Sequence, residues 1–170
     1  MTNISMTNTS MTNTSVDAGI DMRPFEASLP MALLRARETA MALFRPLLAE
    51  NDLTEQQWRV LRALSAAREP IDAGELAEQT FLLAPSLSRI LAAMDERDLI
   101  GRTADPSDHR RALITLSKSG ARLVQSIAPH SEARYERIED AFGADRLHAL
   151  LHELHELAVL EVDPIDAGAS

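Results

Sequence analysis

The sequence predicts a mainly α-helical, single-domain fold with one small β-hairpin. Ala, Leu, Arg and Glu are abundant, whereas the 170 residues include only 6 Gly and 4% aromatic residues, a composition that favours helices over an extensive sheet. Apolar residues recur at helical spacing along most of the chain, and only two short stretches have a strand pattern. With 45% hydrophobic residues, a chain of this length can bury a sizeable core.

The first predicted helix covers residues 28–50 and follows a tail that we expect to be disordered. Residues 1–27 open with a pentad of small polar residues repeated three times, which cannot bury apolar surface. Ser28 is the candidate N-cap of the helix and Pro30 suits its first turn, whereas Pro46 is expected to bend or end it.

Two capping-box patterns predict the next two helices. In a capping box, a Ser, Thr or Asp side chain and a Glu or Gln three residues later satisfy free N–H groups at a helix start. The pairs are Thr54 with Gln57, and Asp72 with Glu75. They predict a helix over residues 55–67 and a short one that ends near Gln79.

The fourth predicted helix begins at Pro85, which suits a first helical position. Its apolar residues recur at i, i+3, i+4 and i+7 and predict a buried face: Leu87, Ile90, Leu91 and Met94. The opposite face is left free for other contacts and carries Ser86, Ser88, Arg89 and Ala93.

Strands are predicted over residues 99–103 and 111–116, joined by the turn sequence of residues 105–108. Two further helices follow the hairpin, separated at Gly143, and extend to about residue 162. The predicted order is therefore four helices, a two-stranded hairpin and two helices.

Two short helices joined by a tight turn and followed by a hairpin are typical of a winged helix-turn-helix. In that arrangement the second helix enters the DNA major groove, and the hairpin, or wing, reaches a flanking groove or the backbone. The candidate DNA contacts at the start of this helix are Pro85, Ser86, Ser88 and Arg89. The alternative is that the serines are ordinary cap or surface residues and that Arg89 is a solvated cation or part of an internal ion pair.

The formal net charge of −9 is unusual for a DNA-binding protein, but the charge is unevenly distributed. Residues 99–120 contain four basic and two acidic side chains, so positive charge is concentrated at the hairpin. This local excess is what DNA contact by a wing requires, although a chain with 17 basic residues can also contain such a stretch by chance.

The hairpin resembles that of the MarR family of winged-helix regulators. The family's wing has the pattern Asp-x-Arg followed by Leu-Ser/Thr-x-x-Gly. The matching residues are Asp108, Arg110, Leu116, Ser117 and Gly120. The resemblance covers about residues 29–160. It departs from the family at Thr80-Phe81, where the family often has Gly, and at Asp98, where Gly is common. Asp tolerates a left-handed backbone, so the second departure is mild.

The resemblance implies that the wing binds DNA. Asp108 lies two residues from Arg110, on the same side of an extended segment, and can hold that arginine for insertion into a minor groove. Arg102 and Arg111 would contact phosphates. The alternative is a salt bridge within the wing that has no role in DNA binding.

Residues 28–38 and 53–61 resemble the MarR subgroup that regulates catabolism of homoprotocatechuate (3,4-dihydroxyphenylacetate). This resemblance implies a repressor released from its operator by a small aromatic acid, bound between dimer helices and winged domain. An apolar slot with a cation and a hydroxyl would suit the acid, and Trp58, Arg37 and Ser28 are the right kinds of group. Alternatively, Trp58 is a core residue, Arg37 an interface ion pair and Ser28 only a cap.

A homodimer is expected through residues 28–50 and 117–162, which flank the DNA-binding segment of residues 55–116. A monomer would expose a leucine stripe on the last helix: Leu147, Leu150, Leu151, Leu154 and Leu157. Two-fold symmetry would place the two helices that enter the major groove, one from each subunit, about one duplex turn apart. This arrangement predicts a pseudo-palindromic operator. The winged domain covers residues 28–162, and residues 163–170 form a flexible C-terminus.

Other functions find little support in the sequence. It has no Cys, no phosphate-binding loop and no nucleophile motif, so we predict no enzyme activity, no cofactor and no bound metal. His148, His152 and His155 offer a metal-responsive alternative but more simply form a solvated helix edge. A helical interaction scaffold without DNA contact is the rival class. No membrane span or signal peptide is apparent, so a cytoplasmic protein is expected.

Overall fold

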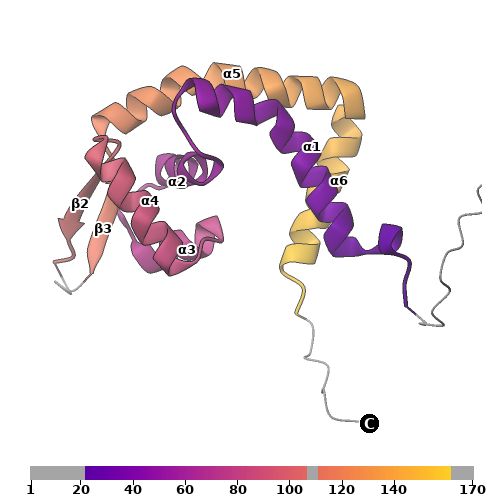
Figure 1. Cartoon of the computed structure of the whole chain (residues 1–170), viewed down its shortest axis with the longest axis horizontal. Coiled ribbons are helices and arrows are strands. Elements are labelled where there is room, and N and C mark those ends of the chain that lie inside the picture. The colour runs from indigo at the N-terminus through magenta and orange to yellow at the C-terminus, as the bar shows by residue number, and fades with distance from the viewer. Residues whose placement is uncertain (1–21, 107–110, 162–170) are drawn as a thin grey trace, which may run out of the picture. The chain divides into compact units, whose positions relative to one another are not determined.

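The computed structural model describes residues 22–106 and 111–161 (Figure 1). In chain order the elements are η1 (Phe25–Ala27), α1 (Leu29–Glu50), α2 (Glu55–Ala66), β1 (Ile71–Asp72), α3 (Ala73–Thr80), α4 (Ala84–Glu96), β2 (Ile100–Ala104), β3 (Ala112–Leu116), α5 (Lys118–Phe142) and α6 (Ala144–Ala158). The six α-helices and the hairpin confirm the predicted fold class. No helix within the described ranges is long and apolar enough to cross a membrane.

The chain divides into two units, Met1–Ala36 and Arg37–Ser170. The first contains η1, a short 3-10 helix inside the segment predicted as a disordered tail, so that segment is not irregular throughout. Pro24 precedes η1, and the Ser28 N–H donates to the Phe25 carbonyl at 3.2 Å. The predicted tail residues 1–21 and the C-terminal residues 162–170 lie outside the described residues.

Helix α1 continues through Pro46 to Glu50, so this proline does not end the helix. Proline removes one intrahelical hydrogen bond, but packing can hold the helix on both sides of it. Phe44, Leu47 and Leu48 are all buried next to Pro46. The Arg134 guanidinium of α5 also donates to the Leu43 carbonyl at 2.9 Å. Tertiary contacts therefore outweigh the local effect of the proline.

The predicted helix starts are confirmed at α2 and half confirmed at α3. Thr54 and Gln57 form a complete capping box, with reciprocal hydrogen bonds of 3.1 and 3.0 Å. At α3, the Asp72 side chain accepts from the backbone N–H groups of Gly74 and Glu75, at 2.7 and 3.0 Å. The Glu75 side chain instead accepts from Gln79 at 3.1 Å, so the second half of that box is not made.

Helices α2, α3 and α4 surround one apolar core with the sheet. Leu87, Leu91 and Met94 of α4 are buried, as their spacing predicts, and Ile90 is half-buried. They belong to one core cluster with Leu61 of α2. Further buried members of this cluster include Val60, Leu64, Leu76, Ile114 and Ile127. Burial of this face fixes which side of α4 remains exposed.

The wing is part of a three-stranded sheet in the order β1-β3-β2, not the two-stranded hairpin that the sequence predicts. Strands β2 and β3 pair antiparallel, with Ile100 opposite Leu116 and Ala104 opposite Ala112. The missed strand β1 pairs Ile71 with Ile114. Two residues are too few to show an alternating pattern, so this strand has no recognisable sequence signal.

The Leu-Ser-x-x-Gly motif locks the start of α5 against the end of α4. The Ser117 hydroxyl donates to the Asp98 carbonyl at 2.5 Å and accepts from the Gly120 N–H at 2.9 Å. Gly120 is buried, and a Cβ placed there would lie 2.1 Å from the Leu99 carbonyl oxygen. The motif thus permits a close backbone contact between α5 and Leu99, in the turn that joins α4 to β2.

Candidate functional site

Two residues other than glycine have a left-handed backbone next to α4. Phe81 ends α3 in the left-handed region with φ of 51°, at the position where the sequence departs from the expected Gly. Asp98, the second departure, is also left-handed with φ of 52° at the end of α4. Both positions therefore have the conformation that Gly would supply, although each carries a side chain.

The outward face of α4 is arranged as the sequence predicts. Pro85 lies in the first turn, and no side chain caps the helix start. Ser88 and Arg89 are exposed and Ser86 is half-buried. The Arg89 Nε lies 3.4 Å from the Pro85 carbonyl oxygen, a weak contact that leaves the guanidinium accessible.

A shallow hollow of about 320 Å³ joins this face of α4 to the start of α2. It is lined by Thr54, Gln56, Gln57, Ser86, Arg89, Ile90 and Ala93. Gln56 is exposed beside Arg89 and was not among the sequence-predicted contacts. A helical capping pattern does not show which distant helix lies beside it, so the sequence carries no signal for Gln56.

Two of the predicted wing contacts are engaged in ion pairs. Arg102 of β2 pairs with Asp95 of α4 at 3.5 Å, and Arg111 pairs with Asp72. These pairs connect the wing to α4 and to β1, so the two arginines have a structural partner as well as exposed surface. The predicted tip residues Asp108 and Arg110 lie outside the described residues.

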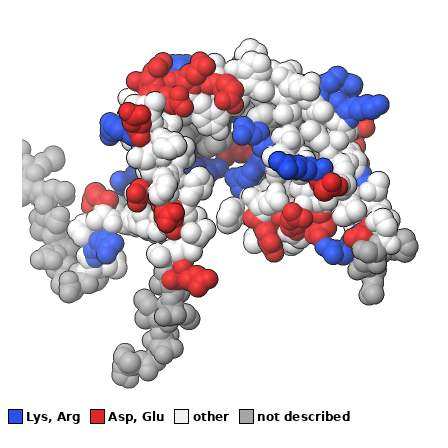
Figure 2. All heavy atoms as spheres, turned by 180° about the vertical axis from the view of Figure 1, so that it is seen from behind, with Lys and Arg blue, Asp and Glu red and all other residues white. Residues whose placement is uncertain are grey.

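Acidic side chains gather over the C-terminal end of α5 (Figure 2). Helix α5 starts at the wing, where Gly120 meets Leu99, and its 25 residues extend for about 37 Å at 1.5 Å per residue. That length is several times the Debye length of about 8 Å at physiological ionic strength.

Arg37, a predicted effector ligand, belongs to a closed ring of four charged side chains: Arg37, Glu38, Arg45 and Glu55. Glu38 lies 2.6 Å from Arg37 and 2.5 Å from Arg45, and Glu55 bonds to both arginines. Partial burial alone would raise the pKa of Glu55, but hydrogen bonds from Arg45 and Arg37 outweigh it and hold that pKa below its ordinary value. Arg37 thus has two carboxylate partners already.

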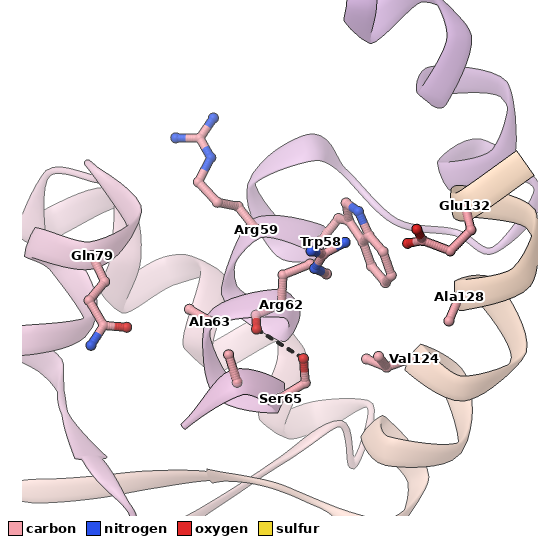
Figure 3. A pocket seen from close by; sticks show the side chains of 10 residues that line it. Trp58, Arg59, Arg62, Ala63, Ser65, Gln79, Val124, Ala128 and Glu132 are labelled. Carbon is pink, nitrogen blue, oxygen red and sulfur yellow. Dashed lines mark hydrogen bonds between the residues drawn. The ribbon is translucent and has the colours of Figure 1, made fainter. Parts of the chain in front are cut away.

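A cavity of about 590 Å³ lies between α2 and α5 (Figure 3). Trp58, Arg59 and Arg62 come from α2, and Val124, Ala128 and Glu132 from α5. An adjoining cavity of about 270 Å³ is lined by Arg37, Met41, Glu55, Trp58, Arg59, Arg62 and Tyr135. The structure therefore brings the predicted Trp58 and Arg37 to one cavity wall, whereas Ser28 belongs to the first unit.

Trp58 is both a core residue and a cavity residue. Its side chain is 9% exposed and packs in the core cluster, yet it borders both cavities. The Arg62 guanidinium lies 6.0 Å from the Trp58 ring centroid. Within the described residues this guanidinium has no ion pair or hydrogen bond, so its charge is available to a bound anion. Sequence reasoning missed Arg62 because nothing in the spacing distinguishes it from a solvated helix cation.

The leucine stripe on α6 is only partly covered by the described part of the chain, with Leu147 and Leu154 half-buried. No residue of α6 is buried, and Leu150, Leu151 and Leu157 are 40%, 47% and 37% exposed. The three histidines of the same helix are exposed as well: His148, His152 and His155. Among the described residues no group of three or more His, Cys, Asp or Glu is placed to hold a metal ion.

Comparisons with known proteins agree with this geometry. A sequence model of the MarR family matches residues 51–111. The chain is 40% identical over 133 residues to the homoprotocatechuate degradative operon repressor of Escherichia coli, covering 78% of this chain and 89% of that protein. Such relatives are regulators and not enzymes.

Two solved structures are also similar. The crystal structure of NadR in complex with 4-hydroxyphenylacetate has a TM-score of 0.73 and 34% identity, covering 84% of this chain and all of that one. The repressor CouR, bound to a 23-mer DNA duplex, has a TM-score of 0.67 and 31% identity, covering 78% and 94%. The chain therefore belongs to the MarR family of winged helix-turn-helix transcriptional regulators.

Proposed function

We propose that the protein is a homodimeric repressor that binds a pseudo-palindromic operator and leaves it when a small phenolic acid binds. The observation that carries the proposal is the cavity between α2 and α5. It combines an aromatic wall, Trp58, with the cation of Arg62, which has no ion pair or hydrogen bond among the described residues. A relative is named as the repressor of the homoprotocatechuate degradative operon, and a similar structure holds 4-hydroxyphenylacetate. The proposed target is therefore an aromatic-acid catabolic operon.

Operator binding is assigned to α4, the start of α2 and the wing. The first turn of α4 would enter the major groove with Ser86, Ser88 and Arg89, while Gln56 at the start of α2 would contact the neighbouring backbone. Of the predicted wing contacts, Arg110 would reach the minor groove.

Replacing Arg89 by alanine is expected to weaken operator binding about tenfold or more, because a bidentate contact to guanine is worth about 1–3 kcal/mol. The measurement is fluorescence anisotropy with the DNA region upstream of the protein's own coding sequence, across a salt series. Arg137→Ala is the matched control, since Arg137 is an exposed arginine on α5. Equal affinities for the two variants would contradict the assignment of α4.

The effector is proposed to lie with its ring on Trp58 and its carboxylate on Arg62. Arg62 is preferred over the sequence-predicted Arg37, because Arg37 already bonds to Glu38 and Glu55. Ser28 remains a candidate partner for a hydroxyl group, as the sequence suggests. Binding would release DNA because the effector favours a spacing of the recognition helices that does not match successive major grooves.

Arg62→Gln is expected to weaken binding of 4-hydroxyphenylacetate about 10- to 100-fold in isothermal titration calorimetry, since a hydrogen bond to a charged group contributes about 1.5–3 kcal/mol. Arg37→Gln should weaken it less than about threefold by the same reasoning. If Arg37→Gln weakened binding more than Arg62→Gln, Arg37 would be the carboxylate partner. If neither this acid nor 3,4-dihydroxyphenylacetate binds or weakens operator affinity, the effector proposal fails.

A further inference from the structure

Arg59 connects the cavity to the helix-turn-helix by a single side chain. It lies on α2, between the cavity residues Trp58 and Arg62, and lines both cavities. Its guanidinium donates to the backbone carbonyl of Thr80, with the Nη1 and the oxygen 2.8 Å apart. Thr80 is the last residue of α3. The Arg59 side chain therefore reaches the end of α3, directly before the turn that leads to α4.

The carbonyl that Arg59 satisfies lies at a critical point of the turn. Thr80 is fully buried, and its hydroxyl donates to the Leu76 carbonyl at 2.5 Å. The next residue, Phe81, has the left-handed conformation, which costs a residue with a side chain about 1 kcal/mol or more. Its N–H and that of Leu82 close the end of α3 on the carbonyls of Glu78 and Ala77, at 3.3 and 3.2 Å. Arg59 adds a charge-assisted bond from another helix to this strained end.

We propose that Arg59 is the positioning residue through which the effector releases the operator. This inference rests on the proposed function and assigns its regulation to one hydrogen bond. Without effector, Arg59 holds the end of α3 and the turn in the geometry that α4 needs for DNA. A carboxylate in the cavity draws the Arg59 guanidinium away from Thr80.

The direction of the switch follows from the relative strength of the two acceptors. A carboxylate is a stronger acceptor for a guanidinium than a neutral carbonyl, because it carries a negative charge and can accept two parallel N–H bonds. Once the guanidinium has turned to the cavity, the Thr80 carbonyl at the buried helix end loses its partner. The effector therefore binds more tightly to the conformation with a loosened turn, and DNA to the conformation with an ordered one. Such differential affinity is what couples two sites.

The test compares operator affinity with and without 4-hydroxyphenylacetate in the full-length protein. For the wild type the acid is expected to weaken operator binding about tenfold or more, within the usual range of about 5- to 150-fold for coupled sites. In Arg59→Gln the acid should change operator affinity less than about twofold, while calorimetry still detects its binding through Arg62. Arg59→Lys keeps the positive charge and can donate to one acceptor at a time. This variant should therefore retain part of the coupling.

Hydrogen–deuterium exchange distinguishes this role from a merely structural one. If Arg59 only stabilised the fold, the acid would not change amide exchange at the end of α3. In the wild type, 4-hydroxyphenylacetate should accelerate exchange of the amides of residues 80–83, whereas 4-hydroxyphenylacetamide, which lacks the carboxylate, should not. In Arg59→Gln the same amides should exchange fast with or without the acid. Should Arg59→Gln fail to fold, the wild-type exchange data and Arg59→Lys still decide the matter.

The outcomes separate this inference from the proposed function. A protein that binds no operator, or that ignores the acid altogether, overturns the proposed function and this inference with it. A protein released by the acid with undiminished coupling in Arg59→Gln, or with unchanged exchange at residues 80–83, overturns only the role of Arg59.

Discussion

Replacing Gly120 by alanine is expected to destabilise the protein by about 3 kcal/mol, because overpacking against an atom that cannot move costs up to about that amount. The added Cβ would lie 2.1 Å from the Leu99 carbonyl oxygen and 2.9 Å from a Leu116 methyl carbon. The backbone oxygen cannot turn aside as a side chain would, so either the start of α5 or the end of the recognition helix must shift. A shift at the start of α5 would also disturb the bond between Ser117 and Gly120.

Thermal unfolding measures this effect. For a chain of this size, about 3 kcal/mol corresponds to a decrease in Tm of about 6–12 °C. Gly101→Ala is the matched control, since its Cβ would meet only the Thr115 side-chain oxygen, at 3.1 Å. That variant should stay within about 1 kcal/mol of the wild type. A Gly120→Ala protein that melts with the wild type would show that α5 and the wing are not in close backbone contact.

The features that local chemistry determines could be predicted from the sequence. The Thr54–Gln57 capping box and the buried face of α4 depend on residues within two helical turns of each other. Their side-chain spacing is therefore visible in the chain itself. The MarR-like wing motif likewise turned out to have a local physical basis, in the bond of Ser117 to Gly120.

The features that depend on distant partners could not be predicted. Strand β1 exists only because Ile71 meets Ile114, some forty positions later. Arg111 appeared free for phosphate, yet Asp72 lies beside it in the fold. The same holds at the cavity, where the closed ring around Arg37 and the bond from Arg59 to Thr80 each join separate helices. The sequence suggests which types of side chain an effector site would use, but it does not show which arginine lacks a partner among the described residues.

Leu151→Glu is expected to convert the protein to a monomer and to abolish tight operator binding. Leu150, Leu151 and Leu157 expose an apolar strip that soluble monomers rarely retain, and a carboxylate within a two-fold interface would face its own copy. A monomer holds one half-site at a time, so it loses the gain of about 10²- to 10⁴-fold that linked binding provides. Light scattering after size-exclusion chromatography measures the mass, and anisotropy with the full operator measures the affinity.

His152→Glu separates loss of the apolar contact from the added charge. It introduces the same carboxylate one position further along α6, rotated by about 100° around the helix axis, where His152 is exposed. This variant should remain dimeric and bind the operator as the wild type does. Leu151→Glu should also keep the wild-type affinity for an isolated half-site, because α2, α3, α4 and the wing do not include the substituted residue. Loss of half-site binding would indicate misfolding, and a Leu151→Glu protein that stays dimeric would contradict dimerisation through α6.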